Sequence, residues 1–235
     1  MKVTVIYGTM HKGSTYNCVK NLLNNTKIND SDITEFFLPK DMPHFCCSCF
    51  SCFLKGEDYC PHYKEVQPIA KALEEADLIV LSSPVYVLNV SGQMKALLDH
   101  LGYRWMPHRP YQEMFSKVGV VISTAAGAGT KEANKVMKKS LLFMGVRKVY
   151  SYGINVGAMS FEDVGTKKKE KIEKQLQKLG DKVIKSVKNS SKKGPSCFAK
   201  MLFYLMRMSQ KNNKWNKTDY NYWKDNGWLD GKKPW

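Results

Sequence analysis

Apolar residues along the chain follow two alternating patterns. Short apolar runs rich in β-branched residues predict strands over residues 2–7, 33–38, 77–86, 117–123 and 146–156. Segments with apolar positions three or four residues apart predict helices over residues 15–27, 65–75, 92–101, 131–144 and 167–188. The pattern therefore predicts strands and helices that alternate along the chain.

This alternation constrains the fold. Two strands joined through a helix run parallel, because the crossover returns the chain to the same end of the sheet, and the crossover is right-handed. Repeated units of this kind predict an α/β three-layer sandwich, in which a five-stranded parallel sheet carries helices on both faces. Such sheets bind ligands at the carboxyl ends of their strands, where the strand order reverses. The loops after the first, third and fourth strands are therefore the candidate binding site.

The first of these loops, GTMHKGSTYN at residues 8–17, is suited to an anion. Its glycines permit close backbone approach, and the helix that follows begins with unpaired N–H groups. The loop has neither the G-x-G-x-x-G pattern of a dinucleotide fold nor the G-K-S/T ending of an NTPase loop. A phosphomonoester fits here, and a simple helix cap without a ligand is the alternative. The expected contacts are Thr9, His11, Gly13, Ser14, Thr15 and Asn17.

The other two loops are suited to a planar ring. The second loop, SSPVYVLNVSGQMKALLDH at residues 82–100, begins with a stiff turn at Pro84 and a flat apolar wall. The third loop, STAAGAGT at residues 123–130, has residues small enough for backbone N–H groups to reach a ring edge. Each loop alone is compatible with ordinary turn chemistry. Together with the first loop they favour bound FMN. The residues expected to flank its ring are Pro84, Val85, Tyr86, Val87, Thr124, Ala125, Ala126 and Gly127.

Five of the seven cysteines lie in one run, FCCSCFSCFLKGEDYC at residues 45–60. Cys46, Cys49 and Cys52 follow C-x2-C-x2-C spacing and Cys60 comes later, which resembles the pattern that holds a [4Fe-4S] cluster. Cys47 is a spare that could substitute for Cys46. Unloaded thiols are the alternative. Disulfides are disfavoured in a reducing compartment, and a zinc site usually gathers its sulfurs from two separated C-x2-C pairs.

Composition and charge add limits to this interpretation. The chain has 235 residues, enough for one sizeable domain, and no apolar run long enough to span a bilayer. The first strand begins at once, so we expect a cytoplasmic protein without a secretion signal. The net charge is +16, and residues 162–235 hold 19 Lys and Arg against 8 Asp and Glu. A solvated basic helix explains this excess, and no nucleic-acid motif accompanies it.

These motifs together resemble the NAD(P)H-dependent FMN reductase family of flavodoxin-like proteins, and within it the iron-sulfur flavoproteins. The first loop is similar to the family's G-S-P-R-x-G-N-T. The segment SPVY...SGQMKALLDH and the cysteine run ahead of ADLIVLSSPVY carry the rest of the likeness. The resemblance covers about the first two thirds of the chain. Met10 and His11 stand where the family often has Pro and Arg, so one expected phosphate-binding cation is either missing or replaced by His11 or Lys12.

The resemblance implies an enzyme that accepts a hydride from NAD(P)H and passes electrons to a small-molecule or protein acceptor, directly or through a cysteine-bound cluster. The first alternative is an electron-transfer protein that a partner protein reduces without NAD(P)H. The second is a basic binding protein that has kept the fold and lost the cofactor. Because the family shares its flavin pocket between subunits, the resemblance also implies a homodimer or a higher homo-oligomer.

The remaining features concern the C-terminal part and the histidines. We expect residues 1–190 to form the FMN-binding domain and residues 191–235 to form a helical, basic extension that packs on this domain or on a partner subunit. Its apolar segment 197–208 favours packing over membrane binding. Cys18 is expected to be a buried core residue. The spacing of the histidines predicts surface or structural roles for His44, His62, His100 and His108.

Overall fold

A five-stranded parallel sheet forms the centre of the molecule. The computed structural model describes residues 1–26, 28–158, 160–190 and 193–235. Neighbouring strands run parallel in the order β2-β1-β3-β4-β5, which is the flavodoxin-like order of a doubly wound sheet. The predicted fold class is therefore confirmed. The strands are β1 (Val3–Tyr7), β2 (Ile33–Phe37), β3 (Leu78–Pro84), β4 (Val118–Ala125) and β5 (Lys148–Asn155).

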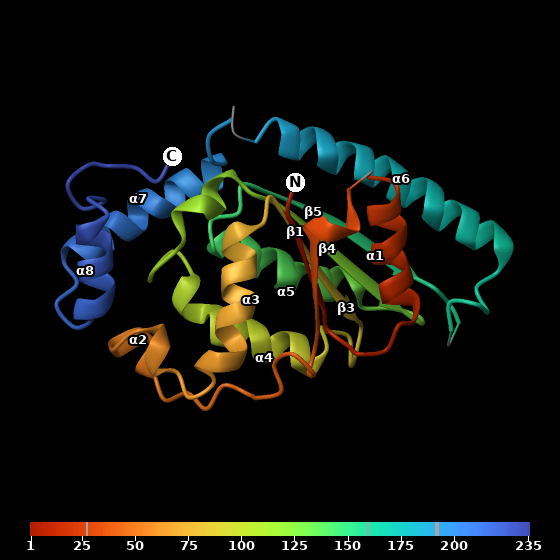
Figure 1. Ribbon diagram of the computed structural model, residues 1–235, viewed down its shortest axis with the longest axis horizontal. Coiled ribbons are helices and arrows are strands. Elements are labelled where there is room, and N and C mark those ends of the chain that lie inside the picture. The colour runs from red at the N-terminus through yellow and green to blue at the C-terminus, as the bar shows by residue number, and fades with distance from the viewer. Residues whose placement is uncertain (27, 159, 191–192) are drawn as a thin grey trace.

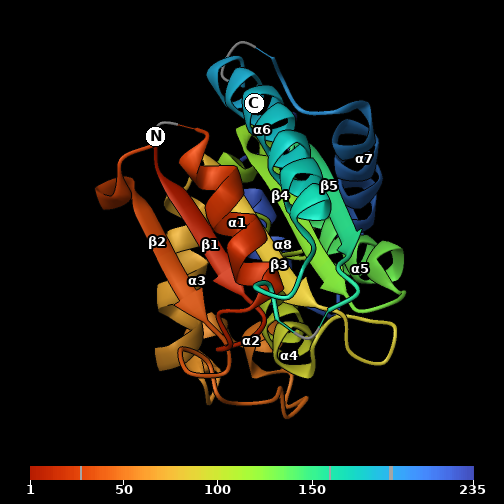
Figure 2. The same cartoon turned by 90° about the vertical axis from the view of Figure 1, so that its right-hand side faces the viewer.

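Helices cover both faces of the sheet, as Figure 2 shows. One face carries α1 (Ser14–Asn24) and α6 (Thr166–Lys188), and the other carries α3 (Tyr63–Glu75), α4 (Gly92–His100) and α5 (Thr130–Phe143). Alternation along the strands explains this division, because successive side chains point to opposite faces. In β1, Val5 packs in the α1 and α6 layer, whereas Ile6 packs in the layer of α3, α4 and α5.

The predicted elements differ from the observed ones mainly at their ends. Helix α1 ends at Asn24 instead of continuing to residue 27, which lies outside the described residues. Strand β3 ends at Pro84, because the chain then folds into a tight hairpin between Tyr86 and Asn89. The periodicity did not predict the short α2 (Ser51–Leu54) or the 3-10 turns. These turns are η1 (Asp30–Asp32), η2 (Glu57–Tyr59), η3 (Leu101–Arg104) and η4 (Gln112–Ser116).

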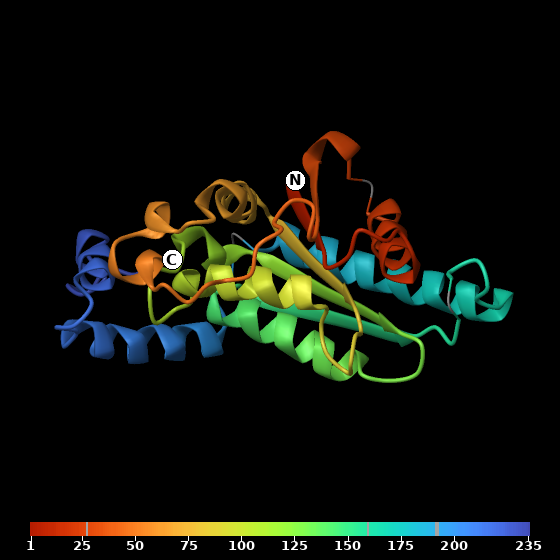
Figure 3. The same ribbon diagram turned by 90° about the horizontal axis from the view of Figure 1, so that it is seen from below.

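The C-terminal segment forms two further helices, α7 (Cys197–Lys211) and α8 (Lys217–Asp225). Both lie at one end of the molecule, where α8 is beside α2 (Figures 1 and 3). They have a small core of their own, in which Phe203 stacks on Trp223 with ring centroids 5.0 Å apart. This core includes Met106 and Phe115 from the segment between α4 and β4, so the extension packs on its own chain.

Candidate functional site

The loops after β1, β3 and β4 meet at the carboxyl edge of the sheet. The Gly8 N–H donates a hydrogen bond to the Ser82 carbonyl over 2.7 Å, which joins the first loop to β3. The hydroxyls of Thr15 and Thr124 are hydrogen-bonded at 2.6 Å in a buried position, which joins α1 to β4. The structure thus brings together two residues predicted from separate loops to contact one ligand.

The start of α1 is suited to an anion. Within the described residues, no side chain caps this helix, and its first turn carries no acidic group. The first N–H groups of the helix and its positive end are therefore available to a ligand. The His11 ring lies against Gly13, where an added Cβ would come within 2.7 Å of it. The Asn17 side-chain amide donates to the Gly13 carbonyl at 3.1 Å, and the Thr9 hydroxyl accepts from the His11 N–H at 3.2 Å.

The loop after β3 ends in an exposed apolar hairpin. Backbone hydrogen bonds of 2.9 and 3.0 Å join Tyr86 and Asn89, and the two residues between them, Val87 and Leu88, have left-handed φ angles of 49° and 58°. This conformation is strained for a β-branched residue, and the Val87 side chain is 99% exposed. The hairpin therefore presents apolar surface at the rim of the candidate site.

The β3 and β4 loops are also joined, because the Val85 N–H donates to the Thr124 carbonyl at 2.9 Å. Beyond Thr124 the chain turns outward. Ala125 is buried, whereas Ala126 and Gly127 are exposed, and no atom of the described residues lies within 4 Å of a Cβ built on Gly127. The backbone of this loop is therefore accessible at the edge of the site, as a ring-binding loop requires.

The cysteine run forms a second candidate site. A cavity of about 240 Å³ is lined by Cys46, Cys47, Cys49, Cys52 and Cys60. The structure thus brings the predicted cluster ligands, together with the spare Cys47, to one place. Ser48 and Phe50 within this loop have left-handed φ angles of 53° and 57°. Left-handed residues that alternate with other conformations create concave backbone sites of the kind that bind phosphates and iron-sulfur clusters.

The thiols of this cavity influence one another. Burial raises the pKa of Cys52 to about 11, and the neighbouring sulfurs of Cys60, Cys46 and Cys49 add to the shift. Burial also raises the pKa of Cys60, whereas hydrogen bonds from Ser51 lower the pKa of Cys49. Sulfurs that repel each other as thiolates are close enough to share a positively charged metal centre, which would remove that repulsion.

Two histidines lie beside these cysteines, although their spacing in the sequence predicted no site. His62 Nδ1 and His100 Nε2 are 2.9 Å apart, and both residues line the cysteine cavity. The ring of His44 stacks on that of His62 with centroids 4.4 Å apart. Burial, with His44 and His100 nearby, lowers the pKa of His62. His62 and His100 are 38 residues apart, so no local motif could have revealed the pair.

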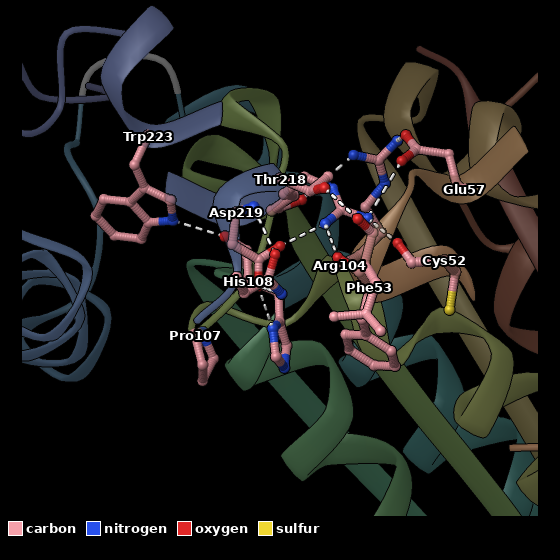
Figure 4. A network of polar contacts seen from close by, with 12 residues as sticks. Cys52, Phe53, Glu57, Arg104, Pro107, His108, Thr218, Asp219 and Trp223 are labelled. Carbon is pink, nitrogen blue, oxygen red and sulfur yellow. Dashed lines mark hydrogen bonds and ion pairs between the residues drawn. The ribbon is translucent and has the colours of Figure 1, made fainter. Parts of the chain in front are cut away.

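A buried ion pair connects the cysteine loop to the C-terminal extension (Figure 4). The Arg109 guanidinium binds the Asp219 carboxylate, and their side chains are 4% and 1% exposed. Arg109 also donates to the backbone carbonyls of Cys52 and Phe53. The Nδ1 of His108 donates to Asp219 at 2.7 Å. One arginine therefore joins α8 to the backbone of a predicted cluster ligand.

Further contacts strengthen this connection. The Thr218 hydroxyl donates to the Leu54 carbonyl at 2.6 Å, and the Trp223 indole donates to the His108 carbonyl at 2.6 Å. Glu57, at the end of the cysteine loop, pairs with Arg104 at 2.6 Å. Apart from Cys52, no residue of this network was predicted to belong to a site, because its contacts join residues that are far apart along the chain.

Helix α4 joins the two candidate sites. At its start the Ser91 hydroxyl caps the helix by accepting from the Met94 N–H at 3.2 Å, and it donates to the Gly8 carbonyl at 2.6 Å. At its end, Asp99 and His100 line the cysteine cavity. A helix of this length spans about 13 Å, so the first loop and the cysteine cavity lie at opposite ends of one short rigid element.

Comparison with known proteins places these features in a family. The model of a family described as NADPH-dependent FMN reductase matches residues 1–158. An iron-sulfur flavoprotein of Archaeoglobus fulgidus is 26% identical over 235 residues, which cover 97% of this chain and all of that protein. An iron-sulfur flavoprotein of Methanocaldococcus jannaschii is 28% identical over 184 residues, which cover 76% of this chain and 91% of that protein.

A solved structure of a flavone reductase has a TM-score of 0.59 and 16% identity, with 80% of this chain and 64% of that chain covered. At this identity the likeness concerns the fold alone. In the part of the chain that the structure describes, no helix is both long and apolar enough to cross a membrane. The family match, which spans the three loops and the cysteine run, confirms the predicted resemblance. The chain belongs to the NADPH-dependent FMN reductase family and is an FMN-dependent oxidoreductase.

Proposed function

We propose that the protein accepts a hydride from NAD(P)H with bound FMN and passes the electrons to a small acceptor or through a [4Fe-4S] cluster. The observation that carries the flavin part is the meeting of three loops at one sheet edge. The Thr15 and Thr124 hydroxyls join the loops after β1 and β4, and backbone hydrogen bonds join both of them to the end of β3. The names of the archaeal relatives support the cluster part. We place the protein in the cytoplasm, because this reducing compartment keeps clustered thiols from forming disulfides.

The phosphate of FMN is held at the start of α1. Backbone N–H groups and hydroxyls of the first loop bind the dianion, and the positive end of the helix stabilises its charge. His11, whose ring lies against Gly13, takes the place of the arginine common in the family. The full set of phosphate contacts is Thr9, His11, Gly13, Ser14, Thr15 and Asn17.

The ring of FMN lies between the two other loops. When bound, FMN supplies the two-electron chemistry, so the chain needs no acid or nucleophile of its own. The chain's residues orient the ring with backbone N–H donors of Thr124, Ala125, Ala126 and Gly127. Pro84, Val85, Tyr86 and Val87 form the opposite apolar wall and exclude water.

The cluster is held by Cys46, Cys49, Cys52 and Cys60, with Cys47 able to replace Cys46. The donor set fits, because these sulfurs line one cavity and the loop has the left-handed residues of a concave anion site. The extension at residues 191–235, of which 191 and 192 lie outside the described residues, acts as a support for this loop through Arg109 and Asp219.

The flavin and nicotinamide steps can be tested on protein purified without oxygen. A flavin absorption spectrum that bleaches within seconds of mixing with NADPH or NADH in a stopped-flow instrument supports the enzyme. A flavin that NAD(P)H leaves oxidised, but that a reduced electron-transfer protein bleaches, favours the alternative of a carrier that a partner reduces. A colourless preparation that binds no added FMN contradicts both.

The cluster has a separate test. Anaerobic reconstitution followed by iron and sulfide assays should give about four irons per chain, with an electron paramagnetic resonance signal after reduction. Cys52→Ser should lose this iron. Phe45 and Phe50 are exposed and do not shield the loop from oxygen. Protein kept in air should therefore lose its iron before it loses its flavin. Fewer than about three irons per chain, with no electron paramagnetic resonance signal after reduction, would favour thiols that hold no cluster.

The protein also assembles as a homodimer or a higher oligomer. Exposed apolar side chains of α7 recur at helical spacing and form one stripe, which a second copy of the chain would cover. They are Phe198, Met201, Leu205 and Met208. Sedimentation at micromolar concentration tests this, and a single species of one-chain mass would contradict it.

A further inference from the structure

The cysteine cavity contains a second set of candidate metal ligands, two of which the cluster does not use. Sulfur and nitrogen atoms of Cys60, His62 and His100 all lie within 4.8 Å of one another. His62 immediately precedes α3, and His100 is the last residue of α4. Two helix ends therefore hold the two histidines, and Cys60 directly follows η2.

The orientation of His100 favours metal binding. Its Nδ1 is 2.8 Å from the Ala96 carbonyl, and a carbonyl can only accept, so Nδ1 carries the proton. The lone pair of a neutral His100 ring is then on Nε2, which lies next to His62. Histidines that bind metals are commonly oriented in this way by a backbone carbonyl. The residue is 5% exposed, so its ring has little freedom to turn away.

His62 completes the arrangement from the other side. Its Nδ1 is 2.9 Å from His100 Nε2, while two nitrogens bound to one tetrahedral zinc are about 3.3 Å apart. A small separation of the rings would therefore admit an ion. The His44 ring stacked on His62 limits larger movements of that side chain.

We propose that Cys60, His62 and His100 bind a single divalent transition-metal ion of the zinc class. One thiolate and two imidazoles suit such an ion, and a water molecule completes the four-coordinate shell. The site differs from the cluster in two of its ligands and shares Cys60 with it. The Cys60 sulfur would have to be a terminal ligand of both centres, so the ion and the complete cluster exclude each other. This mutual exclusion rests on the proposed cluster.

The site can be tested on full-length protein that has been stripped of metal and kept reduced under argon. Cobalt(II) replaces zinc and gives visible absorption from its tetrahedral coordination and thiolate bond. We expect one cobalt per chain and a dissociation constant at least tenfold higher in His62→Ala and in His100→Ala. Competition with zinc should remove the cobalt absorption.

Matched cysteine variants separate this site from the cluster. Cys49→Ser should keep the cobalt affinity and lose reconstituted iron, whereas His62→Ala should lose cobalt affinity and keep the iron. Cys197→Ser, which changes an exposed thiol on α7, should alter neither. Circular dichroism and the flavin content show whether each variant is folded, which matters most for buried His100.

Cobalt binding that is unchanged in both histidine variants would overturn the proposal. So would an equal loss of affinity in Cys49→Ser, because the cysteine run alone would then hold the ion. If the chain takes up no cluster at all, the cobalt measurements still decide the mononuclear site. Zinc that blocks iron uptake in the unmodified chain, but not in His62→Ala, would support the mutual exclusion.

Discussion

The loops of the flavin site and the loop of the cysteine cavity are held in different ways. The loops after β1, β3 and β4 bind one another directly, through the Thr15 and Thr124 hydroxyls and through backbone groups. The cysteine loop after β2 is held instead from outside the sheet, by Arg109, which pairs with Asp219 of α8. The candidate flavin site is therefore part of the folded sheet, whereas the cysteine cavity depends on the extension. Each region should fail separately when its own contacts are removed.

Loss of Asp219 should have the most severe effect. Asp219→Ala leaves the buried charge of Arg109 without its partner, which should lower the free energy of unfolding by about 3–5 kcal/mol. Urea denaturation measures this, and iron assays on the folded fraction should show reduced cluster loading with the flavin retained. Glu75→Ala, which breaks exposed ion pairs with Lys2 and Lys71, is the control and should change little. Unchanged stability and iron content would show that α8 does not hold the loop.

A negative charge at the start of α1 should weaken flavin binding and leave the cysteine cavity intact. Thr15→Asp, or Ser14→Asp at a less buried position, places a carboxylate beside the expected phosphate, and like charges repel strongly near a protein surface. We expect this repulsion to cost about 3 kcal/mol, which would lower the affinity for FMN about a hundredfold. Fluorescence titration of the stripped protein measures the affinity.

The iron content should be unaffected in these variants. Asn24→Asp adds the same charge at the exposed far end of α1 and should leave the flavin affinity unchanged. Full flavin affinity in both Ser14→Asp and Thr15→Asp would contradict the phosphate assignment.

The hydroxyl pair between the loops can be tested by a double-mutant cycle. Thr124→Val leaves the buried Thr15 hydroxyl without its partner, which should destabilise the protein by about 1–2 kcal/mol. Replacing both residues by valine should recover much of that loss, because two apolar groups of the same shape need no hydrogen bond. Thermal unfolding of the single and double variants measures the coupling. Strict additivity would mean that the two hydroxyls act independently.

The smallest effect should be a gain in stability. Val87 is fully exposed and left-handed, so Val87→Gly removes strain without removing packing. Glycine loses more backbone entropy on folding than valine does, which offsets part of this gain. We expect a net stabilisation of about 0.5–1 kcal/mol in the flavin-free protein. Tyr86→Gly, next to it with an ordinary φ, should instead destabilise the hairpin. A loss of stability in Val87→Gly would show that its side chain has a partner.

The same contrast explains how much could be predicted from the sequence. The sheet and its helices followed from apolar periodicity, because the period of each element is a local property. The meeting of the three loops at one sheet edge followed as well, since Thr124 lies near the end of a predicted strand and Gly13 directly precedes α1. The cysteine run was evident from its spacing, and its convergence on one cavity agrees with that prediction.

The supports of the cavity could not be predicted in this way. His62 and His100 come from different helices, and Arg109 and Asp219 are 110 residues apart. Only the folded chain brings such residues together, and no periodicity or short motif records their contact. The left-handed hairpin at Val87 also went unpredicted, because its sequence lacks the Asn or Gly that usually marks such a turn.

The hydrogen bond from Thr218 to Leu54 has a consequence for the order of events during synthesis. The two residues are separated by 164 positions, so a ribosome needs roughly 8–30 s to reach the second after the first. Throughout that interval the cysteine loop lacks the helix that fixes it. The five thiols emerge first and are exposed to metals and oxidants before their cavity is complete. If the loop carries the proposed cluster, its delivery would best follow translation of α8, and the earlier interval is when the thiols are most open to the wrong metal or to oxidation.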